Sequence, residues 1–229
     1  MRKFVLAMVG GLVVWSQVAA EGLVYRLPPD GTSARFDLTF DAKGKTLTGS
    51  LVMSSVGQTT VDGEKCRWLE FKTVLEGETN IAKVLIPEKH LKAGANPGEK
   101  ALKIWVKRGK REAEELADLK DKKAGPAPVL LSGPYQNVKK LAKEAVDKTP
   151  LGKGVECAGV TGTNTFDQGK EKITITFEDR LHDMAPFGVV TSRMTFKITR
   201  DDVEQESGVL ALRLTEIGKN AQSELPDAK

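Results

Sequence analysis

The chain has 229 residues, with 35 Lys and Arg against 31 Asp and Glu, and 40% of its residues are hydrophobic. This length fits one ordinary globular domain or two small ones. The apolar content excludes a fully disordered chain, and the balanced charge excludes a dedicated polyanion binder. The 22 Gly, 10 Pro and 2 Cys exclude collagen-like and multi-cysteine scaffolds.

The first twenty residues have the layout of a secretory signal peptide. Arg2 and Lys3 precede an apolar stretch over residues 4–15, and Ala20 ends a run of small residues before Glu21. Signal peptides combine these three features. We therefore expect cleavage near Ala20 and export to the periplasm or the extracellular space. An uncleaved membrane anchor is the alternative.

Alternation of apolar and polar residues dominates the remaining chain. Phe36, Leu38 and Phe40, for example, alternate with polar residues. This period places alternate side chains on one face of a sheet. It predicts about nine strands, at residues 35–41, 47–54, 66–75, 81–86, 101–108, 155–162, 172–179, 189–200 and 208–216.

The middle of the chain has a different pattern. Residues 111–123 are rich in Glu, Ala, Leu and Lys, and residues 134–147 place Val138, Leu141 and Ala145 at helical spacing. Both segments predict helices. We therefore expect an α+β fold, in which an antiparallel sheet carries two inserted helices.

The domain organisation follows from these elements. We expect a signal peptide over residues 1–20, then one β-rich domain over residues 21–218 with a helical insertion at about 111–147. The polar residues 219–229 predict a flexible tail.

Basic residues are concentrated in the middle of the chain. Residues 97–154 contain 14 Lys and Arg against 8 Asp and Glu. No aromatic residues interleave with these charges in the expected helices, so we expect no nucleic-acid partner. A solvated basic face is one explanation, and docking to an acidic protein or to an envelope surface is the other.

Cys66 and Cys157 both follow the signal peptide. An oxidising compartment favours one long-range disulfide between them. Two small buried thiols are the alternative.

Candidate catalytic or metal-ligating groups are few. His90 and His182 each lack a second His or Cys three to five residues away, which zinc sites commonly have. Cys157 could act as a nucleophile only with a free thiol. The best local cluster is Glu178, Asp179, His182 and Asp183, which fits either a metal or general-base site or a solvated turn. We expect no catalytic residue, no metal, no cofactor and no enzymatic activity.

The alternating strands share one apolar face, which is the candidate ligand-binding surface. With few aromatic residues and only two helices to cover it, this face could leave a cleft for an apolar ligand. A filled core is the alternative. The candidate lining residues are Phe36, Phe40, Leu51, Met53, Leu69, Ile104, Ile175, Phe196 and Leu212.

Two features resemble known exported proteins. The segments Val155-Glu156-Cys157, 173–177 and 185–190 are similar to segments of exported bacterial proteins. The order of elements, from signal peptide through strands and a helical insertion to returning strands, resembles the bacterial lipoprotein-carrier superfamily. Periplasmic members of that superfamily fold as an incomplete β-barrel with helices in its mouth.

The resemblance implies a strongly curved half-barrel and a monomeric, non-enzymatic carrier for a hydrophobic or lipid-linked ligand. It transfers no individual functional residue to this chain. The alternative function is a structural or protein-interaction module of the cell envelope that binds no small ligand.

Overall fold

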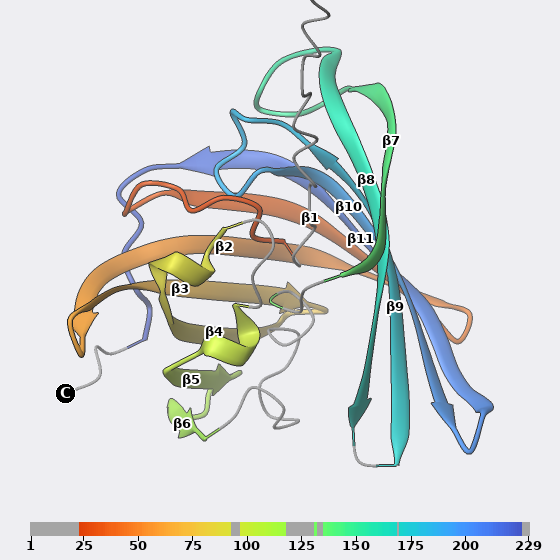
Figure 1. Cartoon of the computed structure of the whole chain (residues 1–229), viewed down its shortest axis with the longest axis horizontal. Coiled ribbons are helices and arrows are strands. Elements are labelled where there is room, and N and C mark those ends of the chain that lie inside the picture. Colours follow the sequence, from red (N-terminus) through yellow and green to blue (C-terminus); the bar gives the residue numbers. More distant parts are fainter. Residues whose placement is uncertain (1–22, 93–96, 118–130, 132–134, 169, 226–229) are drawn as a thin grey trace, which may run out of the picture.

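The computed structural model describes residues 23–92, 97–117, 131, 135–168 and 170–225. In this part of the chain eleven strands form one antiparallel sheet, and two short 3-10 turns accompany them (Figure 1). The strands are β1 (Ser33–Ala42), β2 (Lys45–Val61), β3 (Glu64–Leu75), β4 (Glu78–Pro87), β5 (Lys103–Arg108), β6 (Glu114–Leu116), β7 (Gln136–Val146), β8 (Val155–Gln168), β9 (Glu171–Leu181), β10 (Val189–Arg200) and β11 (Val203–Gly218). The 3-10 turns are η1 (Glu88–His90) and η2 (Gly98–Lys100).

The first and last strands meet at the centre of the sheet. The strand order is β6-β5-β4-β3-β2-β1-β11-β10-β9-β8-β7. The chain therefore runs outward from β1 to one edge at β6, resumes at the opposite edge at β7, and returns to the centre. There Phe36 of β1 lies opposite both Leu51 of β2 and Leu214 of β11.

Tight turns connect the strands of the first half. Lys43 and Gly44 join β1 to β2 with φ angles of 51° and 73°, and Asp62 and Gly63 join β2 to β3 with 50° and 80°. Two successive positive φ angles are the signature of the two-residue hairpin turn whose twist matches that of the flanking strands. Such turns allow consecutive strands to pair directly.

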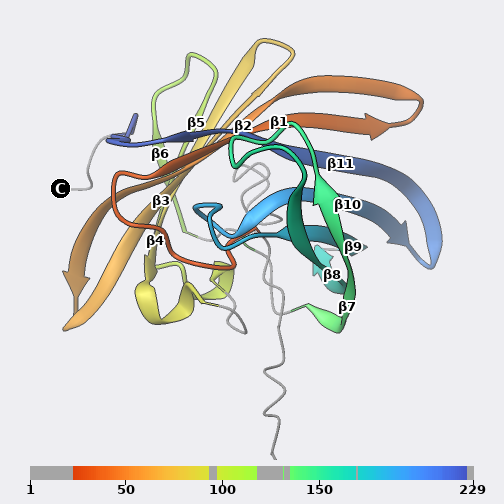
Figure 2. The ribbon, with the colours of Figure 1, turned by 90° about the horizontal axis from the view of Figure 1, so that it is seen from above.

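The two faces of the sheet differ in character. One face carries Phe36, Met53, Leu69, Ile175 and Leu212, and we call it the inner face; the other is the outer face. Each of these five side chains is at most 3% exposed, and burying one such side chain contributes about 1.5–3 kcal/mol. The sheet curves around the inner face (Figure 2), so the curved antiparallel sheet that we expected is present.

The expected α+β class with two inserted helices is wrong. Each of the nine expected strands overlaps an observed one, but β6 lies within residues 111–123 and β7 replaces the helix expected at 134–147. Residues 118–123 lie outside the described residues. No helix among the described residues is long and apolar enough to cross a membrane.

Register shifts explain why β7 has the spacing of a helix. Its pairing with β8 is irregular between Gln136 and Lys139 and again between Leu141 and Glu144. Each irregularity disturbs the strict alternation of the strand, because a bulge adds a residue on one side of the ladder. Val138 and Leu141, which are both partly buried, therefore recur three residues apart instead of two.

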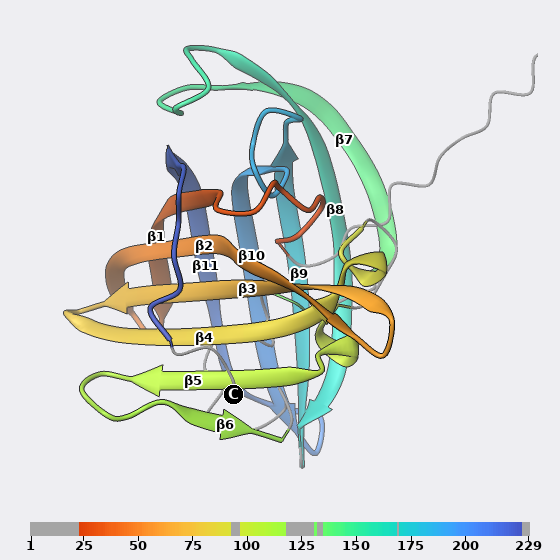
Figure 3. The ribbon, with the colours of Figure 1, turned by 90° about the vertical axis from the view of Figure 1, so that its left-hand side faces the viewer.

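Residues 219–225, which we expected to be flexible, lie across the outer face of β3 and β4 (Figure 3). Ser223 donates a hydrogen bond to Glu70 at 2.8 Å, and Lys72 pairs with Glu224 at 2.7 Å. Leu225 is only 3% exposed. The polar residues of this segment have matched partners on the sheet, so their polarity does not leave the segment free. Residues 226–229 lie outside the described residues.

The expected disulfide is absent, since Cys66 and Cys157 are both free and buried. Cys66 lies in β3 and Cys157 in β8, and five strands separate β3 from β8 in the sheet. The two residues also belong to different hydrophobic clusters. Each thiol instead contacts a backbone carbonyl two residues earlier, at 3.4 Å.

Candidate functional site

The nine ligand-lining candidates come together in one hydrophobic cluster. Seven of them are buried to 3% exposure or less, and they come from β1, β2, β3, β5, β9 and β11. Phe40 and Phe196 are only partly buried, and their rings stack with centroids 5.6 Å apart and planes 3° from parallel. The structure thus gathers the predicted residues, and most of them are covered.

Segments outside the strands cover this inner face. They contribute buried apolar side chains to the same cluster, and we call residues 23–32, 88–91, 131, 135 and 182–188 together the cover. In Figure 2 the segment that begins at Leu23 lies inside the curve of the sheet. The buried apolar side chains of the cover are Leu23, Val24, Leu91, Leu131, Tyr135, Ala185 and Phe187.

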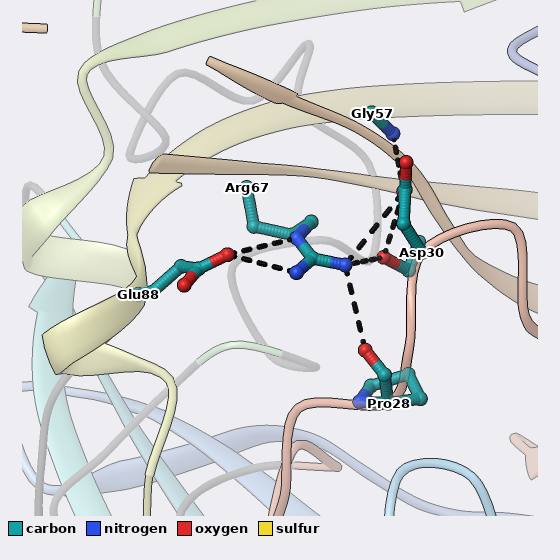
Figure 4. Close-up of polar contacts among 6 residues, drawn as sticks. Pro28, Asp30, Gly57, Arg67 and Glu88 are labelled. Atoms are coloured by element: carbon teal, nitrogen blue, oxygen red, sulfur yellow. Dashed lines mark hydrogen bonds and ion pairs between the residues drawn. The ribbon is translucent and has the colours of Figure 1, made fainter. Parts of the chain in front are cut away.

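Arg67 of β3 ties two parts of the cover to the sheet (Figure 4). Its guanidinium group is nearly inaccessible, since the residue is 4% exposed. Nη2 lies 2.8 Å from Glu88 in η1, and Nη1 lies 3.7 Å from Asp30 in the N-terminal segment. Nη1 also donates to Ser55 of β2 at 2.8 Å. A buried cation with these partners fixes both segments against the end of the inner face.

Tyr25 and Asp179 form a second link between cover and sheet. The Tyr25 hydroxyl donates to Oδ2 of Asp179, in β9, at 2.6 Å. Burial raises the pKa of Asp179 to about 7, although Ser192 and Tyr25 beside it favour the charged form. The backbone of Tyr25 also donates to the carbonyl of Phe187 at 3.0 Å, and Arg26 donates to the carbonyl of Asp183. The N-terminal segment is therefore joined to both β9 and the β9–β10 loop.

The acidic cluster around His182 does not assemble into one site. Glu178 and Asp179 are neighbours on a strand and point to opposite faces: Glu178 pairs with Arg180, whereas Asp179 bonds to Tyr25. His182 accepts a hydrogen bond through Nδ1 from the backbone of Met184 at 3.1 Å. Among the described residues no group of three or more His, Cys, Asp and Glu is arranged to hold a metal ion.

Cys157 does not have the surroundings of an activated nucleophile. Its side chain is buried, and burial raises the pKa of the thiol. A raised pKa keeps the sulfur protonated, whereas the thiolate is the reactive form. The nucleophilic site considered for Cys157 therefore gains no support from its environment.

Sequence reasoning missed Arg67 and Tyr25, the two residues that link the cover to the sheet. The sequence does indicate that Arg67 is unusual, because the alternation of β3 places it on the same face as the apolar Leu69 and Phe71. A charged residue in such a row needs a partner from elsewhere in the fold. Tyr25 gave no comparable signal, since its partner Asp179 is 154 residues away.

Comparison with known proteins finds similar solved structures but no matching family. No protein-family model matches the chain, and no curated protein matches it. Similar solved structures include a protein with a YmcC-like fold from Bacteroides fragilis, predicted to be exported, at 12% identity and a TM-score of 0.41 over 86% of this chain and 99% of that one. A DUF1329 family protein from Desulfovibrio piger has 12% identity and a TM-score of 0.37 over 87% of this chain and 89% of that one.

A third similar structure is a β-barrel-like protein of the domain of unknown function DUF1849 from Brucella abortus. It has 11% identity and a TM-score of 0.27 over 86% of this chain and 99% of that one. At these scores the likenesses support no conclusion about function.

Proposed function

We propose that this chain is an exported, non-enzymatic carrier or binding protein for a hydrophobic or lipid-linked ligand, held against the inner face. One observation supports the proposal most directly: irregular segments, and not further strands, close the apolar inner face. Lids and ligand-binding loops are drawn from the less stable parts of a fold. A cover of this kind can open while the sheet stays intact.

The energetics of opening favour an apolar ligand. Moving the cover away exposes the apolar surface beneath Leu23, Val24 and Phe187, which are at most 1% exposed. A ligand with an acyl chain restores the lost burial, because the hydrophobic contribution depends on area and not on direction. A small polar ligand restores none of it.

The polar links then set how readily the cover opens. Arg67 holds Asp30 and Glu88, and Tyr25 holds Asp179. Opening the N-terminal segment breaks the ion pair between Arg67 and Asp30 and the hydrogen bond from Tyr25 to Asp179, and each buried group left without a partner costs about 1–3 kcal/mol. Weakening one link should therefore speed ligand entry without changing the binding surface.

The test is uptake of oleic acid by delipidated protein, followed by displacement of a fluorescent apolar dye. We compare the wild type with Tyr25→Phe, which removes the hydroxyl that bonds to Asp179. Thr215→Val is the matched control, because it removes a hydroxyl that donates to the carbonyl of Arg35, at 3.2 Å, away from the cover.

We expect saturable uptake by the wild type and several-fold faster uptake by Tyr25→Phe, with Thr215→Val unchanged. If neither the wild type nor Tyr25→Phe takes up oleic acid or the dye, the carrier proposal fails. That result would favour the protein-interaction module of the cell envelope.

Export is a separate part of the proposal. It rests on Arg2, Lys3, the apolar residues 4–15 and the small residues up to Ala20, all of which lie outside the described residues. Expression of the full chain in a bacterium followed by N-terminal sequencing tests it. We expect a mature chain in the envelope fraction that begins at Glu21, whereas an intact N-terminus in the cytoplasm would contradict export.

A further inference from the structure

The outer face contains a charged cavity that the proposed function does not use. Its volume is about 690 Å³, within the range of sites for small organic ligands. Strands β1, β9, β10 and β11 form its floor, and the end of β7 with the following turn forms a side wall. The charged residues that line it are Asp37, Glu144, Asp147, Lys148, Glu178, Arg180, Arg193 and Arg213.

Three arginines lie close together on neighbouring strands of the floor. Arg180 of β9 and Arg213 of β11 both lie opposite Thr191 of β10, at one level of the sheet. Arg193 lies two residues further along β10, diagonal to both arginines. Diagonal neighbours in an antiparallel sheet are about 7–8 Å apart, within reach of long side chains. The three guanidinium groups can therefore meet at one place on the outer face.

Arg180 forms ion pairs within the protein. Its Nη2 lies 2.6 Å from Glu144 of β7 and 2.9 Å from Glu178 of β9. The Arg180 side chain reaches β7 by lying directly over Gly159 of β8. A side chain at position 159 would block this path, because its Cβ atom would be only 2.3 Å from Nη1 of Arg180. This residue therefore builds the wall of the cavity, and its single positive charge is shared between two carboxylates.

Arg193 and Arg213 form no such ion pairs with other described residues. Glu178 lies directly opposite Arg193 in the register, yet its carboxylate bonds to Arg180. Asp37 lies directly opposite Arg213, and no ion pair joins them. Among the described residues, none of the ion pairs or side-chain hydrogen bonds involves Arg193 or Arg213. Both arginines have a carboxylate opposite them and leave their guanidinium groups unpaired.

The charges that line the cavity are balanced, four positive against four negative, but they are unequally paired. Glu144 and Glu178 are bound by Arg180, and Asp147 accepts a hydrogen bond from the backbone of Gly154 at 2.9 Å. Among the lining residues, Lys148, Arg193, Arg213 and Asp37 make no ion pair or side-chain hydrogen bond with another described residue, so three of the four cations are available to a bound anion, whereas three of the four carboxylates are already held by other groups. The lining also includes the hydroxyl-bearing residues Thr39 and Thr191.

We propose that Arg193 and Arg213 bind the phosphate group of a ligand in this outer-face cavity. The planar guanidinium group donates two parallel hydrogen bonds to phosphate oxygens, and two such groups on adjacent strands can grip one phosphate from two sides. The phosphate can belong to a soluble phosphate ester or to a lipid headgroup. This site is independent of the apolar inner face and of the carrier proposal.

The test measures binding of inorganic phosphate at each arginine. The Nε–H signals of the arginines are followed by ¹H–¹⁵N NMR during a phosphate titration of the mature chain. We compare the wild type with R193Q/R213Q and with K110Q/R111Q, which removes two exposed charges in the turn between β5 and β6. Circular dichroism checks that each variant is folded, and the single variants R193Q and R213Q replace the double variant if it does not fold.

We expect saturable shifts at Arg193 and Arg213 in the wild type, with the affinity at least tenfold weaker in R193Q/R213Q and within twofold of the wild type in K110Q/R111Q. Shifts that do not saturate, or that are equal at Arg111 and Arg193, would overturn the proposal. Equal phosphate affinity in R193Q/R213Q and the wild type would also overturn it.

A second arm distinguishes the two sources of phosphate. Vesicles of phosphatidylcholine with and without phosphatidylglycerol are sedimented with each protein. Retention that needs phosphatidylglycerol and is lost in R193Q/R213Q identifies a lipid headgroup, whereas saturable phosphate binding without retention identifies a soluble phosphate ester. Both results support the site.

Discussion

Tyr25 and Asp179 are 154 residues apart in the chain, and the Tyr25 hydroxyl donates to Oδ2 of Asp179 at 2.6 Å. Asp179 is fully buried, and Tyr25 belongs to the segment that covers the inner face. This hydrogen bond therefore joins the segment that precedes the first strand to the opposite half of the sheet.

Replacing Tyr25 by Phe should destabilise the protein by about 1–2 kcal/mol, because it leaves a buried carboxyl oxygen without a donor. The free energy of unfolding in urea measures this effect. Thr215→Val should cost less, because Thr215 is only partly buried. Equal losses in the two variants would mean that the Tyr25 link has no special role.

Asp179 should make stability depend on pH. Burial raises the pKa of its carboxyl group from 3.8 to about 7 in the folded state. Between about pH 4 and pH 7 the folded chain therefore binds a proton that the unfolded chain does not, so stability falls as the pH rises through this window. Below pH 4 both states are protonated, and the contribution no longer changes.

Asp179→Asn isolates this contribution, because the amide side chain has a similar shape and does not titrate. The free energy of unfolding of the wild type minus that of Asp179→Asn should fall from pH 4 to pH 7 and level off above it. A difference that is constant across this range would show that Asp179 has an ordinary pKa.

Much of this architecture follows from alternation in the sequence. The strands with a strict period of two were predictable, because a curved sheet with one buried face imposes that period on β1 and β9 to β11. The edge strand β7 was not, because none of its side chains is fully buried and its irregular pairing with β8 leaves Val138 and Leu141 at a helix-like spacing. Only three residues form β6, too few to show any period.

The site was only partly predictable for a related reason. The nine apolar residues share one face of the sheet, and the alternation of apolar and polar residues along each strand shows which side chains share a face. The cover has no period, and its links to the sheet, Arg67 to Asp30 and Tyr25 to Asp179, join residues that are far apart in sequence. Such long-range polar pairs have no local signature.

Arg67 should be the most sensitive polar residue of the cover. Arg67→Met removes the ion pair with Asp30 and the charged hydrogen bonds to Glu88 and to the buried Ser55, and should destabilise the protein by about 2 kcal/mol. Limited proteolysis should then cut the N-terminal segment near Asp30 faster. Arg200→Met, which breaks the exposed pair with Glu171, is the control and should have a much smaller effect. Similar unfolding curves for the two variants would contradict the role given to Arg67.

The thiols should be free and slow to react. Cys66 and Cys157 are both inaccessible, and burial raises the pKa of each thiol. We expect two thiols to react with a chromogenic disulfide reagent in urea and neither to react quickly in the native protein. Absence of both thiols in urea, together with a mass two hydrogens lower, would show that the mature protein forms the disulfide.

The C-terminal segment should contribute to stability through Leu225. This residue is 3% exposed, and its carbonyl lies 3.4 Å from Nζ of the fully buried Lys83. Leu225→Ala should lower the free energy of unfolding by about 2 kcal/mol, because it removes buried apolar contacts. Val203→Ala is the control, since Val203 is 61% exposed and should tolerate truncation. If Leu225→Ala is as stable as Val203→Ala, the segment is not docked in solution.

We propose that the inner face accepts a hydrophobic ligand beneath its cover. Native mass spectrometry of the mature protein, isolated from a bacterial envelope and compared with its organic extract, tests this most directly. We expect a bound lipid-like species that delipidation removes and added oleic acid replaces. A bare monomer that stays empty after incubation with oleic acid and with an envelope lipid extract would show that the inner face is only a folding core.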